Sequence, residues 1–330
     1  MRSIRFAGLV LVCSCVVASI HAQARLLVAQ KGEDSLGIVD PVAGTVIASV
    51  AEGGTTGHEV IASPDGKLAY VPIYGNSGVG LKGTDGSNLV VIDIAAQKVV
   101  GHVDFGSGVR PHMPIFGPKD GLLYVTTELD RSITIVDPKT LQIVGSIPTG
   151  QPESHMLALS HDGTRGYTAN VAPGTVSVLD IPGRKLLKII PVSSNTQRIS
   201  ISKDDRWVFT ADQEKPQLAV IDTRKGEVSR WIPLDGIGYG TAVTLDGRWL
   251  LVTIPTKSKV AVVDLTTMQV VRTVETPADP EELLAQPGGK TVWVSCVLPH
   301  TVAELDLGTW TIGRKIVMGR NSDGIAWAGQ

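Results

Sequence analysis

Cysteine is nearly absent from this sequence once its N-terminal stretch is set aside. Of the three cysteines in 330 residues, Cys13 and Cys15 lie in that stretch and Cys296 lies far from both. If the stretch is removed during export, no intrachain disulfide can form, even in an oxidising compartment. Val294 and Val297 flank Cys296 in an alternating apolar pattern, which indicates a packed thiol rather than a nucleophile.

An excess of charge of one sign is also missing. The chain has 30 basic and 32 acidic side chains, a formal net charge of −2, and no long run of either sign. This composition provides no polybasic surface, so we expect no binding to nucleic acid or to an anionic membrane. Beyond the N-terminal stretch, no apolar run is long enough to span a bilayer, and no helical periodicity of useful length occurs. We therefore expect no transmembrane segment.

The N-terminal stretch has the composition of a secretory signal peptide. It begins with arginines, residues 6–20 are apolar, and residues 22–24 read Ala-Gln-Ala, the small-x-small pattern of a cleavage site. We predict a signal peptide over 1–24 and one exported domain over 25–330. The VCSC sequence around Cys15 resembles a lipoprotein site, but apolar sequence continues after it, so we expect no lipid anchor. A periplasmic and an extracellular location both stay open.

A repeat runs through the rest of the chain. A β-branched run that ends in aspartate and leads into a turn occurs seven times, for example as ITIVDPKT, VSVLDIPG and LAVIDTRKG. A carboxylate at the first position of a turn can accept backbone N–H bonds, so we interpret all seven aspartates as turn residues. After a first interval of 53 residues they recur every 42–44 residues, at Asp40, Asp93, Asp137, Asp180, Asp222, Asp264 and Asp306.

Each repeat unit contains four short strand patterns joined by tight turns. In the unit that begins near residue 154 these are HMLALS, RGYTANV, TVSVLD and KLLKIIPV. Four-stranded units of this period are typical of a β-propeller, in which antiparallel sheets stand radially around an axis. Residues 322–329 match a first strand and 26–50 match strands two to four. We therefore predict an all-β, seven-bladed propeller whose ring is closed by one blade that both termini share.

Three segments resemble a known repeat. GYTANVAPGTVSVLD (166–180), LLYVTTELDRSITIVD (122–137) and SPDGKLAYV (63–71) are similar to the YVTN-type seven-bladed propeller repeat of secreted bacterial and archaeal proteins. The resemblance covers essentially all of 25–330 and implies a fold rather than one activity. The wider group of similar propellers includes lactonase-like enzymes and surface-layer modules, so the function has to be argued from the site.

One polar residue per unit stands at the start of the predicted innermost strand. Because innermost strands surround the axis and begin on one face, these side chains should converge at the mouth of the central channel. The set is His58, His112, His155, Gln197, Tyr239, Glu281 and Asp323. Glu59, Arg198 and Glu282, each one residue later, add a second tier.

Three interpretations of these residues stay open. Polar side chains are ordinary at the wet mouth of a channel. His58, His112 and His155 come from consecutive units and form a candidate site for one divalent metal ion, because imidazole and carboxylate ligands suit such ions. Alternatively, the site needs no cofactor and holds a small anionic or sugar-like molecule, with Arg198 as the partner of the anion.

We expect a monomeric, exported binding protein whose partner at the channel face is a small molecule or a protein. The alternative is an enzyme of the lactonase, lyase or isomerase kind that similar propellers perform. In that enzyme a metal or His155 polarises the substrate, and Arg198 holds a carboxylate. Glu281 or Glu282 acts as acid or base. A structural module of the cell envelope is the third alternative.

The largest insertion in the repeat is the glycine-rich segment 74–88. It lies between the second and third strands of its unit, and that connection emerges on the same face as the start of the innermost strand, beside His112. The segment is therefore either a flap at the channel mouth or an ordinary surface loop. It contains a GxGxxG pattern, but a strand rather than a helix follows, which argues against dinucleotide binding.

Overall fold

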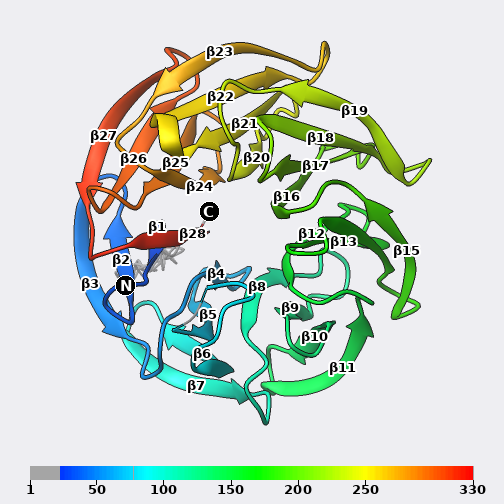
Figure 1. Ribbon diagram of the computed structural model, residues 1–330. Coiled ribbons are helices and arrows are strands. Elements are labelled where there is room, and N and C mark those ends of the chain that lie inside the picture. The colour runs from blue at the N-terminus through cyan, green and yellow to red at the C-terminus, as the bar shows by residue number, and fades with distance from the viewer. Residues whose placement is uncertain (1–22, 77, 330) are drawn as a thin grey trace, which may run out of the picture.

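The computed structural model describes residues 23–76 and 78–329. Seven four-stranded antiparallel sheets stand around a central axis, and Figure 1 looks along that axis. The predicted seven-bladed β-propeller is therefore confirmed. Most of the predicted signal peptide, residues 1–22, lies outside the described residues.

The blade that closes the ring combines both ends of the chain (Figure 1). Its strands, from the axis outward, are β28 (Ser322–Ala328), β1 (Arg25–Gln30), β2 (Ser35–Asp40) and β3 (Thr45–Ala51). β28 pairs antiparallel with β1, with Leu26 opposite Trp327 and Val28 opposite Ile325. Main-chain hydrogen bonds thus join the two ends of the chain, as the sequence predicts.

The other six blades follow in chain order, each with its first strand innermost (Figure 1). Their strands are β4 (Ile61–Ala62), β5 (Leu68–Gly75), β6 (Asp85–Asp93) and β7 (Lys98–Asp104); β8 (Pro111–Phe116), β9 (Leu123–Thr127), β10 (Ser132–Asp137) and β11 (Gln142–Pro148); β12 (Ser154–Leu159), β13 (Arg165–Asn170), β14 (Thr175–Asp180) and β15 (Lys185–Pro191); β16 (Thr196–Ile201), β17 (Trp207–Asp212), β18 (Gln217–Asp222) and β19 (Glu227–Pro233); β20 (Thr241–Val243), β21 (Trp249–Ile254), β22 (Lys259–Asp264) and β23 (Gln269–Glu275); and β24 (Pro280–Ala285), β25 (Thr291–Cys296), β26 (Thr301–Asp306) and β27 (Thr311–Val317). A short 3-10 helix, η1 (Pro255–Lys257), is the single helical element among the described residues.

The repeated aspartates all end the third strand of a blade, where it turns into the fourth. The carboxylate of Asp40 accepts the backbone N–H groups of Val42 and Ala43, each at 2.9 Å. The other six aspartates accept backbone N–H bonds in the same way. Their predicted role as turn residues is confirmed, which leaves the site to be found elsewhere.

The hydrophobic core lies between neighbouring blades. Leu27 and Ile38 of the closing blade pack in one cluster with Val71 and Ile92 of the next blade. Side chains on both faces of a middle strand are covered by adjacent sheets, as the fully buried β9 shows. This face-to-face packing holds the innermost strands in fixed positions around the axis.

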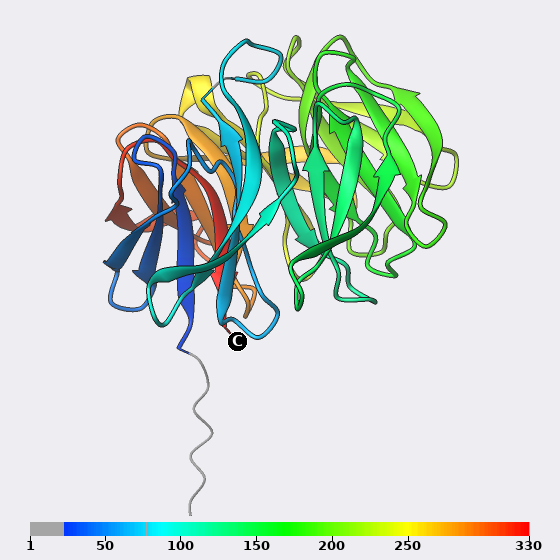
Figure 2. The ribbon, with the colours of Figure 1, turned by 90° about the horizontal axis from the view of Figure 1, so that it is seen from below.

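Figure 2 shows the ring from the side. The C-terminus lies at one face, and the loop between β5 and β6 rises at the opposite face. Because β28 ends at the C-terminal face, it begins at the face with the loop, and so do the other innermost strands. Within residues 23–76 and 78–329, no helix is long and apolar enough to cross a membrane.

Candidate functional site

The innermost strands carry an irregularity where the predicted site begins. In β8, β12, β16, β24 and β28, the register with the adjacent strand contains one extra residue near the strand start. Such a bulge sets two residues opposite one and re-aims neighbouring side chains. The bulge explains how a residue directly after a ring position, such as Arg198 or Glu282, can face the axis as well. Glu281 and Glu282 are consecutive, yet both lie among the charged groups at the axis.

Three histidines and one tyrosine gather on one side of the channel mouth. The rings of His112 and His155 lie 3.6 Å apart between centroids, and His58 approaches His112 edge-on at 5.5 Å. Tyr74, at the end of β5, contacts all three rings, with centroid distances of 4.6, 5.2 and 5.9 Å. We call His58, Tyr74, His112 and His155 the histidine group.

Glu128, directly after β9, holds two members of the histidine group. The hydroxyl of Tyr74 donates a hydrogen bond to Oε2 of Glu128 at 2.8 Å, and Nδ1 of His155 pairs with Oε1. Glu128 and His155 are both buried. Because no water competes for these contacts, the carboxylate fixes the orientation of both rings.

Burial keeps the imidazoles of His58 and His112 neutral. The loss of water around the ring lowers the pKa of His58 to about 3. Burial, followed by the neighbouring imidazoles, holds the pKa of His112 well below its usual value of 6.5. Nδ1 of His112 has no hydrogen-bond partner among the described residues. At neutral pH these two rings therefore offer nitrogen atoms without positive charge.

The other side of the channel mouth is organised around Arg198. Its guanidinium pairs with three carboxylates at 2.5, 2.6 and 3.3 Å, those of Glu59, Glu282 and Asp323. Glu59 is 139 residues away in the sequence, and each carboxylate belongs to a different blade. Arg198 is only 3% exposed, and its Nε has no hydrogen-bond partner among the described residues.

Three further residues complete this side of the mouth. Nζ of Lys31, in the turn after β1, lies 3.0 Å from Asp323. The ring of Tyr239 stands over the guanidinium of Arg198 at 5.0 Å, a cation–π contact. Glu281 interacts electrostatically with Lys31 and Asp323. We call the whole set the carboxylate group: Lys31, Glu59, Arg198, Tyr239, Glu281, Glu282 and Asp323.

Burial and pairing move the pKa values of these carboxylates apart. Burial raises the pKa of Glu59 to about 8, although Arg198 opposes the shift. Burial and the charge of Asp323 raise the pKa of Glu281 to about 7. Asp323 is buried as well, but Lys31 and Arg198 outweigh the burial and hold its pKa at about 2. Protonated and ionised carboxyls thus lie close together near neutral pH, an arrangement suited to proton transfer.

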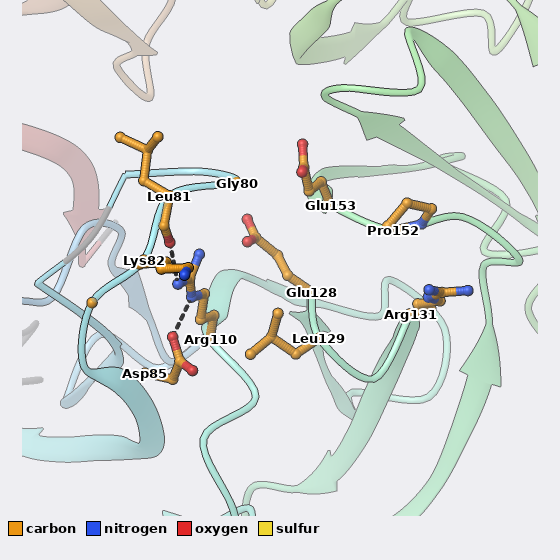
Figure 3. A pocket seen from close by; sticks show the side chains of 11 residues that line it. Gly80, Leu81, Lys82, Asp85, Arg110, Glu128, Leu129, Arg131, Pro152 and Glu153 are labelled. Atoms are coloured by element: carbon orange, nitrogen blue, oxygen red, sulfur yellow. Dashed lines mark hydrogen bonds and ion pairs between the residues drawn. The ribbon is translucent and has the colours of Figure 1, made fainter.

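A pocket of about 520 Å³ adjoins the histidine group. Figure 3 shows Glu128 between its two sides, with the β5–β6 loop and Arg110 on one side and Glu153 on the other. The guanidinium of Arg110 donates hydrogen bonds to Asp85 and to the carbonyl of Leu81, both at 2.6 Å, and so ties the loop to the next blade. Glu128 belongs both to this pocket and to the contacts of the histidine group, so the two regions are adjacent, although the histidines themselves do not line the pocket.

The predicted insertion 74–88 therefore contributes a wall of the pocket. Its residues at positions 80–83 line the pocket together with Asp85. A covering movement over the channel mouth stays a prediction.

Three residues of the site are not predicted by the sequence pattern. Lys31, Tyr74 and Glu128 end or follow the second strands β1, β5 and β9. Second strands end on the face where innermost strands begin, so an alignment of their last residues would have revealed this signal. Gln197, which is one of the predicted ring residues, is half-buried on β16 beside Arg198.

The observed geometry can be compared with the two kinds of ligand site predicted from the sequence, a metal site and an anion site. Among residues 23–76 and 78–329, no three His, Cys, Asp or Glu side chains are arranged to hold a metal ion. His112 and His155 stack on each other, and His155 is engaged by Glu128. Arg198, the predicted anion partner, is already paired with carboxylates. The arrangement thus favours neither a metal nor an anion.

Comparison with known proteins supports the fold. The family model of the cytochrome D1 heme domain matches residues 116–244. No curated protein matches the chain. Membership of the YVTN-type repeat family stays a prediction.

Solved structures resemble the chain closely in fold and distantly in sequence. Pseudomonas aeruginosa periplasmic gluconolactonase, PpgL, has a TM-score of 0.73 and 16% identity over 92% of this chain and 99% of its own. Kuenenia stuttgartiensis hydrazine synthase has a TM-score of 0.74 and 18% identity over 86% of this chain and 92% of its own. Dihydro-heme d1 dehydrogenase NirN in complex with DHE has a TM-score of 0.62 and 18% identity, and the match covers 89% of this chain and 63% of that one. At such identities these similarities establish a β-propeller and no activity.

Proposed function

We propose that this chain is an exported β-propeller that binds a small polar molecule at the channel mouth, between the histidine group and the carboxylate group. The observation that supports this most directly is a pair of unsatisfied buried atoms. Nδ1 of His112 and Nε of Arg198 have no hydrogen-bond partner among the described residues, although their side chains are only 1% and 3% exposed. Buried polar atoms without partners are costly, and a ligand with hydroxyl groups would satisfy them.

A pocket beside the histidine group, which shares Glu128 with it, has the size of a small-molecule site. Its volume of about 520 Å³ lies in the range of small-molecule sites. A protein partner at the same face, or a purely structural role in the envelope, are the alternatives to a small ligand. A structural role would leave the unsatisfied atoms without an explanation.

Ligand binding is testable by thermal unfolding. A panel of polyols and sugar lactones, each at 10 mM, should contain members that raise the melting temperature of the wild-type protein by several degrees, because a ligand stabilises the state that binds it. The variant His112→Ala should lose this response. His161→Ala is the matched control, since His161 is exposed and lies outside the site. An absent response across the panel, with His112→Ala behaving like wild type, would favour the structural role.

A lactone hydrolase is the second candidate, and one observation favours it. Glu281, with a pKa of about 7, and Glu59, with a pKa of about 8, lie in one buried cluster beside the neutral His58. These values are matched to acid–base work near neutral pH. PpgL, which has the same fold, is a periplasmic gluconolactonase.

The reaction would need only water. Glu281, ionised, would take a proton from a water molecule as its oxygen bonds to the carbonyl carbon of the lactone. The ring C–O bond would then break, and Glu59, protonated, would give a proton to the departing oxygen, which yields a hydroxy acid. Glu281→Gln should lower the enzyme-dependent hydrolysis of glucono-1,5-lactone by about 100-fold. The matched control is Glu275→Gln on the outer strand β23, and pH-stat titration measures both after subtraction of the spontaneous rate.

The matched family is named for a heme, and the residues at the channel mouth do not fit one. Heme iron accepts an imidazole ligand, and neutral imidazoles are present. The tetrapyrrole also carries carboxylates, which need cationic partners. Arg198 and Lys31 are already paired with carboxylates of the chain itself. We derive no step that uses a heme.

A further inference from the structure

The two cations of the channel mouth are both occupied. Arg198 contacts three carboxylates, and Lys31 contacts one of the same three, Asp323, at 3.0 Å. The terminal nitrogens of Arg198 are thus engaged by acid groups of the chain itself, and Nε, which lacks a partner among the described residues, offers a single N–H rather than the paired donors that bind a carboxylate most strongly. The nearby imidazoles of His58 and His112 are neutral and add no positive charge.

Carboxyl groups outnumber cations at this position, although Glu59, whose pKa is raised to about 8, holds its proton near neutral pH. Glu59, Glu281, Glu282 and Asp323 face Lys31 and Arg198, and Glu128 stands across the mouth beside His155. In a buried site the repulsion between like charges is screened only weakly by solvent. A ligand that brings another negative charge would increase that repulsion, whereas an uncharged or cationic ligand would not.

From this charge balance we propose that the channel site selects ligands by charge: it accepts uncharged or cationic polyhydroxy molecules and rejects their carboxylate analogues. This inference rests on the proposed small-molecule function and names its ligand class. For a hydrolase of the kind described above, the rule has a direct benefit. The uncharged lactone would be admitted, and the ionised hydroxy acid formed from it would be expelled.

A substitution beside Arg198 should reverse the charge preference of the site. Glu282 lies 2.6 Å from its guanidinium, and Glu282→Gln keeps the shape of that side chain while it removes the charge. Part of the guanidinium then lacks a charged partner. The variant should gain affinity for anions, because a carboxylate or sulfate can form charge-assisted hydrogen bonds with the released N–H groups. A gain of binding is a sharper result than a loss, since misfolding does not produce it.

The experiment uses three probes that share one polyol chain and differ in charge. D-gluconamide is neutral, D-glucamine is cationic and D-gluconate is anionic at pH 7.5. Isothermal titration and thermal unfolding of the wild-type protein should show gluconamide and glucamine binding at least ten times more tightly than gluconate. Glu282→Gln should bind gluconate at least ten times more tightly than wild type does. Glu275→Gln, a change on the exposed outer strand, should leave all three affinities unchanged.

The outcomes separate this inference from the function on which it rests. Tightest binding of gluconate by the wild-type protein overturns the charge rule and leaves the small-molecule site intact. If none of the three polyols binds, the proposed ligand class is wrong, and sulfate then decides the charge rule. Stabilisation of Glu282→Gln by 20 mM sulfate, absent in wild type, supports the rule, and equal responses overturn it. Asp323→Asn serves as a second variant should Glu282→Gln fail to fold.

Discussion

The two sides of the channel mouth are built largely from equivalent positions of the repeat, yet they accommodate buried polar groups by opposite means. In the histidine group, His58 and His112 stay neutral because burial lowers their pKa. The carboxylate group keeps the charge of Arg198 and surrounds its guanidinium with three carboxyl groups, of which Asp323 is ionised. The comparison teaches that an equivalent position in a repeat fixes where a side chain lies and leaves its ionisation to its neighbours.

The largest effect should follow from the loss of the central cation. Arg198→Met keeps most of the side-chain volume but leaves Glu59, Glu282 and Asp323 without their shared partner. Loss of one partner of a buried ion pair costs about 3–5 kcal/mol, and urea unfolding at pH 7.5 should show a destabilisation of this size. Part of the loss should be recovered at pH 5, where the carboxylates bind protons. A cost like that of the exposed Arg320→Met, about 0.5 kcal/mol or less, would contradict the comparison.

The two sides should also make the free energy of unfolding depend on pH in opposite directions. Glu59 has a raised pKa of about 8, so the stability that it contributes is complete below about pH 4.5 and is lost as pH rises through 8. His58 has a lowered pKa of about 3, so its contribution is complete above pH 6.5 and is lost as pH falls toward 3. Each slope is at most about 1.4 kcal/mol per pH unit.

These neighbouring residues allow a matched pair of variants. Glu59→Gln should remove the fall in stability that extends from about pH 4.5 to pH 8, and should therefore flatten the alkaline side of the profile. His58→Gln should remove the rise in stability that extends up to about pH 6.5, and should therefore flatten the acid side. Urea unfolding from pH 4 to pH 9 measures both profiles. If both variants flatten the same side, the division of the mouth into a neutral and a charged side is wrong.

The smallest effect is expected within the histidine group. Tyr74→Phe removes the hydroxyl that donates to Glu128 at 2.8 Å and leaves the ring contacts in place. The loss of one buried hydrogen bond should cost about 1–2 kcal/mol in urea unfolding. Tyr124→Phe is a comparison variant, since its hydroxyl donates to Asp120 at a half-exposed site and should cost less. An equal loss of unfolding free energy in the two variants would indicate that the buried hydrogen bond to Glu128 contributes no more to stability than the half-exposed one to Asp120.

The repeated aspartates were sufficient to predict the fold, because a turn carboxylate acts through its own backbone neighbours and leaves a periodic mark in the sequence. The ring residues were predictable for the same reason, since each occupies one register position of a repeated strand. The partners of those residues were not predictable. Arg198 and Glu59 lie in different blades, and nothing local in the sequence indicates that a guanidinium will meet three carboxylates rather than a ligand. Lys31, Tyr74 and Glu128 lie outside the predicted ring because they stand at the ends of second strands, whereas the ring follows the starts of the innermost strands.

The last strand contributes Asp323, and the turn after the first strand contributes the Lys31 that pairs with it, 292 residues earlier in the sequence. The site is therefore incomplete until β28 has been synthesised and has paired with β1. A molecule bound at the channel mouth would then contact both β28 and the turn after β1, and would hold the two segments together. A bound ligand should therefore stabilise the closed ring, so that the resistance of this protein to unfolding rises with the fraction of sites that are occupied.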